Sequence, residues 1–333
     1  MSSSDTCMLS LKDTKALKGL ALLLLLTHHL FYVQNGLYND IQLYKSIYLV
    51  QEIGMFSKLC VVMFVFLSGY GLMAQADIKG NLGSVKEWYI RRYKKLMFNY
   101  WMIWLVFVPI SYFCFGMTFE KAYHQDIVFQ FVLDFLGVHD IIYSGKNMCF
   151  NPTWWFMSCI ILLYLLFPLM YKMIKRDTFS VLMLTLIISF LPIPYIDVIK
   201  FNVVAFAVGM WMAKNKVAPP SQMRWLVVAL LLLYAAERNF NSYPLMIDCF
   251  LTLLIVQVYQ SGRKPDWIIK FMSFLGKHSM NIFLFHTFIF YFWFQDFIYA
   301  SRNPIIIFLT LLVVCIPISI VLEWGKKYTI YKL

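Results

Sequence analysis

Two adjacent histidines, His28 and His29, interrupt the apolar run LLLLLTHHLF near the start of the chain. Placing a histidine in lipid is costly, so a histidine within a membrane helix marks a functional interior by default. A neutral imidazole can also accept a proton near neutral pH. The pair therefore indicates a catalytic base or a proton relay inside a bundle of helices.

Lys18 precedes His29 by eleven residues. In an α-helix this spacing places both side chains within about 20° of the same face and about 16 Å apart along the axis, whereas His28 points about 80° away from Lys18. A cation and an imidazole on one stripe would suit a ligand with an anionic head and a reactive end. The alternative is that Lys18 anchors the helix at the membrane surface and His29 bonds a neighbouring helix.

The elements that must position these residues are predicted to be membrane helices. Of the 333 residues, 61% are hydrophobic and 14% are charged. Several apolar stretches approach the length of about 20 residues that a helix needs to cross a bilayer. Most of them lack the polar face that a soluble helical bundle would need. The composition therefore predicts an all-α, polytopic integral membrane protein.

Apolar runs bounded by charges, glycine or proline predict about ten spans within a single membrane domain over residues 1–333. The predicted spans are residues 16–34, 55–75, 96–115, 154–173, 179–195, 200–213, 225–240, 245–260, 278–298 and 304–323. The first run follows a basic stretch, as in a signal peptide. It lacks a small-x-small cleavage site, so we expect it to be retained.

Basic residues predict the orientation of these spans. With both termini in the cytoplasm, 22 of the 29 lysines and arginines fall in inner segments, and every inner segment is basic. This is the asymmetry that the positive-inside rule requires, and an odd number of spans would spoil it. The net charge of +12 is therefore explained by the orientation of the spans in the lipid membrane. It does not indicate nucleic-acid binding. We expect a multi-pass protein of the inner or plasma membrane.

Two further patterns are assigned to packing. The seven cysteines mostly lie in apolar runs and form no CxxC pair, so we expect neither disulfides nor a metal site. The stretch SGYG, residues 68–71, has glycines that could let helices approach closely or expose backbone to a ligand. We favour helix packing for this motif.

Six segments, taken in order over almost the whole chain, resemble the acyltransferase-3 family of multi-span membrane enzymes. The family's opening helix has a basic residue and a histidine at the spacing of Lys18 and His29, although arginine is usual where this chain has Lys18. The resembling segments are LKGLALLLLLTHHLFYV, FVFLSGYGL, YIRRYKKLMFNYW, TWWFMSCIILLYLLFPLMY, FAVGMWMAK and LGKHSMNIFLFHTFIF. Each is a weak signal because apolar helices look alike, but their shared order is specific.

The resemblance implies transfer of an acyl group, most often acetyl from acetyl-CoA, to a carbohydrate hydroxyl. The expected acceptor is a surface polysaccharide or a lipid-linked glycan of the cell envelope. His29 is then the expected catalytic residue, acting as the base for the attacking hydroxyl or as an acyl carrier. The donor requires no metal.

The resemblance also suggests where the donor binds. Lys18, Arg91, Arg92 and Lys95 are expected at the cytoplasmic face, where they could bind the phosphates of CoA. Guanidinium groups favour Arg91 and Arg92 for this role. The alternative is that these charges only satisfy the positive-inside rule.

Four residues are candidates on the acceptor side. His286 could orient His29 or bind the acceptor, and a helix–helix hydrogen bond is its alternative role. Trp154 and Trp155 could stack on a sugar ring or belong to the interfacial aromatic belt. His28 is assigned to packing or hydrogen bonding, with a direct role as the alternative.

Two other classes of protein compete with the enzyme. A transporter or flippase of a glycan precursor could use intramembrane histidines as a proton relay. Transporters often contain internal repeats, and this sequence shows none. A non-catalytic membrane partner in glycan assembly is the third interpretation.

Overall fold

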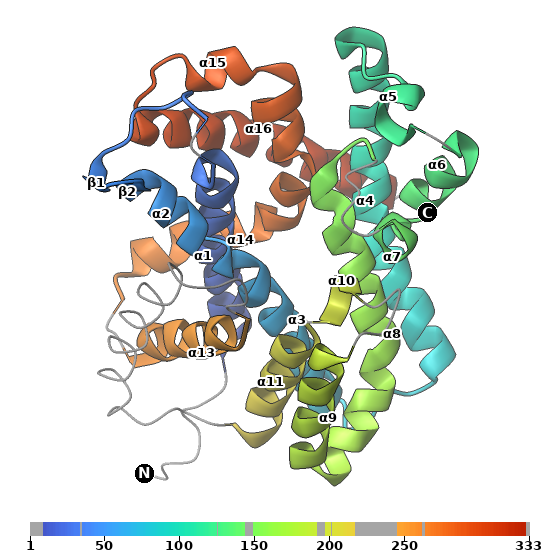
Figure 1. The fold of residues 1–333 in the computed structure, drawn as a ribbon. Helices are drawn as coiled ribbons and strands as arrows, with labels where there is room; N and C mark the ends of the chain where they lie inside the picture. The colour runs from blue at the N-terminus through green and yellow to red at the C-terminus, as the bar shows by residue number, and fades with distance from the viewer. Residues whose placement is uncertain are drawn as a thin grey trace. The chain divides into compact units, whose positions relative to one another are not determined.

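The computed structural model describes residues 9–33, 35–124, 126–143, 149–191, 197–200, 202–216, 245–261 and 264–330. These residues are almost entirely helical, as Figure 1 shows, and this confirms the predicted all-α class. A short antiparallel ribbon joins β1 (Gln42–Tyr44) to β2 (Ile47–Tyr48).

The described helices are, in chain order, α1 (Leu11–Phe31), α2 (Leu49–Phe56), α3 (Leu59–Ile78), α4 (Val85–Phe115), α5 (Phe119–Tyr123), α6 (Ile127–Phe135), α7 (His139–Ile142), the 3₁₀ turn η1 (Pro152–Trp154), α8 (Trp155–Arg176), α9 (Thr178–Phe190), α10 (Asp197–Lys200), α11 (Asn202–Asn215), α13 (Leu245–Ser261), α14 (Asp266–Thr287), the π-helix η2 (Phe288–Trp293), α15 (Gln295–Tyr299) and α16 (Pro304–Ile330).

Length and hydropathy single out four candidate membrane-spanning helical stretches among the described residues. They are Leu49–Ile78, Val85–Phe115, Pro152–Arg176 and Pro304–Lys327. The predicted span 225–240 lies outside the described residues, and the described residues of the other predicted spans are mostly helical.

Several helices extend well beyond the apolar runs that predicted them. Helix α4 starts at Val85 where the sequence predicted residue 96, and α14 starts at Asp266 where it predicted residue 278. Lysine and arginine are good helix formers, so charge ends an apolar run without ending a helix. Hydropathy therefore marks the part of a helix suited to lipid and not its ends.

The chain folds into two compact units. Unit 1 contains Met1–Ala21, Leu59–Trp88 and Leu162–Leu275, and unit 2 contains Leu22–Lys58, Tyr89–Ile161 and Gly276–Leu333. Each unit is therefore assembled from three separate stretches of the sequence.

Unit 1 is built around a close contact between α3 and α11. A Cβ atom on Gly69 would lie 2.2 Å from the carbonyl oxygen of Phe206, and one on Gly209 would lie 2.2 Å from that of Phe66. Only glycine permits this approach of the two backbones. The packing interpretation of SGYG is thus confirmed at Gly69, whereas a Cβ on Gly71 would meet no atom of the described residues within 4 Å.

In unit 2, a polar network joins α14 to α16. The Asn281 side chain donates to Ser319 at 3.2 Å and to Glu323 at 2.9 Å, and it accepts from Lys326 at 2.8 Å. His278 contacts the same serine hydroxyl at 2.8 Å. A buried lysine is tolerated when it is paired and hydrogen-bonded in this way, so the network fixes one register between the two helices.

Candidate active site

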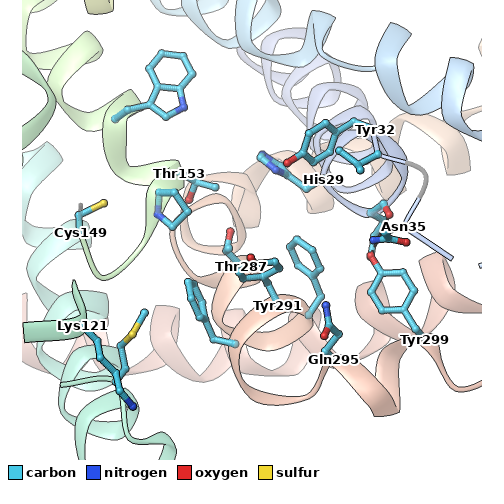
Figure 2. Close-up of a pocket in the computed structure, with 17 residues that line it drawn as sticks. His29, Tyr32, Asn35, Lys121, Cys149, Thr153, Thr287, Tyr291, Gln295 and Tyr299 are labelled. Carbon is cyan, nitrogen blue, oxygen red and sulfur yellow. Dashed lines mark hydrogen bonds between the residues drawn. The ribbon is translucent and has the colours of Figure 1, made fainter. Parts of the chain in front are cut away.

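A cavity of about 590 Å³ lies within unit 2 beside His29. Figure 2 shows His29 and Tyr32 on one side, with Thr287, Tyr291 and Gln295 facing them from α14, η2 and α15. The rest of the lining is a mixture of aromatic, apolar and neutral polar side chains, together with the cation of Lys121. A cavity of this size and character falls within the range of small-molecule sites, about 300–1,000 Å³.

The end of α1 that carries His29 is held by two tyrosines. The Tyr299 hydroxyl donates to the carbonyl of Leu30 at 2.9 Å, and the Tyr38 hydroxyl donates to that of Phe31 at 3.0 Å. The last carbonyls of a helix have no partner within it, so such bonds fix the helix end. Burial raises the pKa of Tyr38 to about 12, which keeps its hydroxyl protonated as a donor.

His28 is held by the helix that packs against this end. A Cβ on Gly54 of α2 would lie 2.5 Å from the carbonyl carbon of Phe31, so glycine is required there. The close approach places the Gly54 carbonyl 2.9 Å from Nδ1 of His28. A carbonyl only accepts, so the His28 Nδ1 carries a proton and donates it.

His29 meets a second histidine, His286 of α14. The two ring centroids are 4.9 Å apart, and His286 is fully buried. Nδ1 of His286 lies 3.0 and 2.9 Å from the carbonyl oxygens of Ile282 and Phe283, so it must be the protonated nitrogen. Its Nε2 is then a bare acceptor, and within the described part of the chain it has no hydrogen-bond partner.

The position of α14 is fixed from the segment that precedes α8. Asn151 Nδ2 and Trp154 Nε1 both donate to the carbonyl of Leu284, at 3.1 and 2.8 Å. Asn151 also caps the η1 turn by accepting from the backbone of Thr153 at 3.0 Å. Hydrogen bonds from two side chains therefore fix α14 at a position two residues before His286.

A family model described as an acyltransferase domain matches residues 13–324. The chain belongs to the acyltransferase-3 family. The match begins in α1, ends in α16 and contains both His29 and His286. No curated protein and no solved structure matches the chain.

Family membership and the apolar helices make this protein a membrane acyltransferase. Both the activity class and the resemblance predicted from the sequence are thereby confirmed, and acyl transfer is supported over the transporter interpretation.

The two predicted tryptophans of the acyltransferase have different surroundings. Trp154 is 2% exposed, and its ring packs against Tyr100 and Phe288. Trp155 is half-buried and lines the cavity. Only Trp155 presents a surface that a ligand in this cavity could touch.

The predicted donor-binding residues do not line this cavity. Lys18 is a half-buried residue of unit 1, and Arg91, Arg92 and Lys95 lie on α4 in unit 2. Arg91 and Lys95 are exposed. The sequence predicted a span over residues 16–34, and helix α1 runs without a break from Leu11 to Phe31, so it carries both Lys18 and His29.

Sequence reasoning missed Asn151 and Thr287. Asn151 precedes a proline at the first position of a helical turn, which is a recognisable N-cap signature. Thr287 follows the predicted His286 directly, but nothing in the apolar run around it marks its hydroxyl as unusual.

Proposed function

We propose that this acyltransferase moves an acetyl group from cytoplasmic acetyl-CoA to a hydroxyl of a cell-surface or lipid-linked carbohydrate. The observation that carries the proposal is that His29 lines the cavity while its ring lies beside that of His286, with 4.9 Å between the ring centroids. The Nε2 of His286 has no hydrogen-bond partner among the described residues. The predicted topology places the protein in the inner or plasma membrane, with this cavity toward the outer side.

His29 is proposed to handle the proton of the reaction. As the acceptor oxygen attacks the thioester carbonyl, His29 takes the hydroxyl proton. The carbon–sulfur bond then breaks, the ester forms, and the proton passes to the CoA thiolate to give free CoA. In the alternative order, a nitrogen of His29 attacks the thioester, the carbon–sulfur bond breaks and CoA leaves as the thiol, and the sugar hydroxyl then takes the acetyl group from His29 and gives its proton back to the imidazole.

His286 is proposed as a positioning residue for His29. Its Nδ1 is committed to two carbonyls, so its Nε2 can accept an N–H from His29. This would fix the tautomer of His29 and leave its other nitrogen for substrate, as the third member of a catalytic triad does. His28, bonded to Gly54, is assigned to holding the end of α1.

The acceptor is proposed to bind among the aromatic and neutral polar side chains of the cavity. Trp155 and Tyr291 could pack against a sugar ring, and Asn35 and Gln295 could bond its hydroxyls. Trp154 is assigned to holding α14 in place, because it is buried and donates a hydrogen bond to the Leu284 carbonyl.

The donor is proposed to enter from the cytoplasmic side. Arg91, Arg92, Lys95 and Lys18 supply cations for its phosphates. Lys18 and His29 are about 16 Å apart along α1, a span that an extended CoA arm can cover. No interaction with nucleic acid follows from this charge.

Purified protein in lipid nanodiscs, given labelled acetyl-CoA and candidate glycans, tests the proposal. We expect release of free CoA and labelled glycan, and we expect His29→Ala to abolish both while remaining in the membrane. His124→Ala removes an exposed histidine outside the cavity and should retain turnover. Wild-type turnover by His29→Ala would remove the catalytic assignment. Movement of a glycan across vesicles without acetyl-CoA would instead support a flippase.

A further inference from the structure

Thr287 places an unpartnered hydroxyl at the cavity. The residue lines the cavity and is 4% exposed, and its Oγ1 has no hydrogen-bond partner among the described residues. A buried hydroxyl without a partner is costly, and each such group in a folded protein needs an explanation.

The geometry of α14 explains why this hydroxyl has no partner in its own helix. A helical threonine ordinarily bonds the carbonyl three or four residues before it, as Thr27 and Thr185 do here. For Thr287 those carbonyls belong to Leu284 and Phe283.

Both of these carbonyls are already occupied by other side chains. The Leu284 oxygen accepts from Asn151 and Trp154, and the Phe283 oxygen accepts from His286 Nδ1 at 2.9 Å. The bond to Phe283 that leaves Nε2 of His286 without a proton therefore also occupies one usual partner of Thr287, and Asn151 and Trp154 occupy the other. The Thr287 hydroxyl is left without these partners at the cavity.

The helix changes its winding immediately after this residue. Thr287 ends α14, and the next six residues form the π-helix η2, which supplies further cavity-lining side chains. Short π-helical turns are rare and occur frequently at functional sites. This second feature points to a ligand at the same place.

We propose that the Thr287 hydroxyl donates a hydrogen bond to the carbonyl oxygen of the acyl group while that oxygen gains negative charge. The inference rests on the acyl transfer proposed at His29. An oxyanion only accepts hydrogen bonds, and Thr287 is a donor, whereas the neighbouring Nε2 of His286 is only an acceptor. A donor fixed in a water-poor site stabilises such a charge most effectively.

A series of variants with graded donor strength tests this role. In the nanodisc assay at saturating donor and glycan, Thr287→Val should lower kcat by about 100- to 1,000-fold. Thr287→Ser keeps the hydroxyl and should remain within about tenfold of wild type, with Thr287→Cys between the two. Thr185→Val is the matched control, because it removes a buried hydroxyl that bonds the Leu182 carbonyl of its own helix. It should keep the wild-type kcat.

Several results would overturn the inference. One is a wild-type kcat for Thr287→Val, and another is a loss confined to the KM for glycan, which would assign the hydroxyl to the acceptor. If Thr287→Val fails to reach the membrane, equal kcat values for the serine and cysteine variants would also overturn the inference. Wild-type protein that never cleaves acetyl-CoA would remove the proposed function as well, whereas an active wild type with a fully active Thr287→Val removes only the role of Thr287.

Discussion

At the level of single residues, the site depends on two histidines whose surroundings differ. His286 has one nitrogen committed to backbone carbonyls and one bare nitrogen, while His29 lines the cavity. The role proposed for each histidine therefore depends on which ring nitrogen of His286 is not bonded to the helix backbone.

Substitution of His286 separates a positioning role from simple packing. His286→Leu fills the space without an acceptor and should lower kcat by about 100-fold. His286→Gln can bond the carbonyls with its amide N–H and face His29 with its oxygen, so it should recover about tenfold of that loss. Steady-state kinetics measure the effect on kcat, and thermal unfolding in detergent measures the effect on packing. Equal kcat values for the leucine and glutamine variants would contradict positioning by hydrogen bond.

At the scale of helices, close packing is concentrated at particular glycines. Gly69 and Gly71 lie two residues apart on α3, yet only the first contacts another backbone, at Phe206. The sequence indicated a packing motif but could not say which glycine makes the contact, because that depends on how α11 crosses α3.

This difference gives a matched pair of variants. Gly69→Ala would place a methyl group 2.2 Å from a carbonyl oxygen, so the helices must separate, at a cost of about 1–3 kcal/mol in the free energy of unfolding. Gly71→Ala meets nothing within 4 Å in the part of the chain that the structure describes and should stabilise α3 by up to about 1 kcal/mol. Unfolding in mixed detergent micelles measures both. Similar stabilities for the two variants would show that the α3–α11 contact is looser than described.

At the scale of the whole molecule, the sequence predicted the helical class and the family correctly, because apolar runs and ordered motifs report these directly. It could not predict that the Thr287 hydroxyl has no partner among the described residues, because this depends in part on a bond between Asn151 and Leu284 across 133 residues. It also missed α6, which buries Gln130 and Asp134 and exposes Val128 and similar side chains. Because the buried face of α6 is polar, a pattern that assumes buried apolar residues does not predict this helix.

The buried carboxyl of Asp134 should give the stability of the molecule a dependence on pH. Helix α6 lies outside the candidate membrane-spanning helices, and Asp134 accepts from the hydroxyls of Tyr100 at 3.0 Å and Tyr123 at 2.8 Å. Burial raises the pKa of Asp134 from 3.8 to about 6. The folded state thus binds this proton more tightly than the unfolded state, and the stabilisation is complete below pH 3.8 and lost as pH rises through about 6.

The expected loss between these pH values is about 3 kcal/mol in the free energy of unfolding. Asp134→Asn keeps a neutral side chain of the same shape and should remove this part of the pH dependence. The Tyr100 hydroxyl also reaches the main-chain oxygen of residue 134 at 2.6 Å, so it retains an acceptor in the variant. Chemical unfolding of both proteins in detergent from pH 4 to pH 7.5 measures the difference. Parallel curves would mean that Asp134 is ionised in the folded protein throughout this range, and that its two tyrosine hydroxyls stabilise the charge enough to offset its burial.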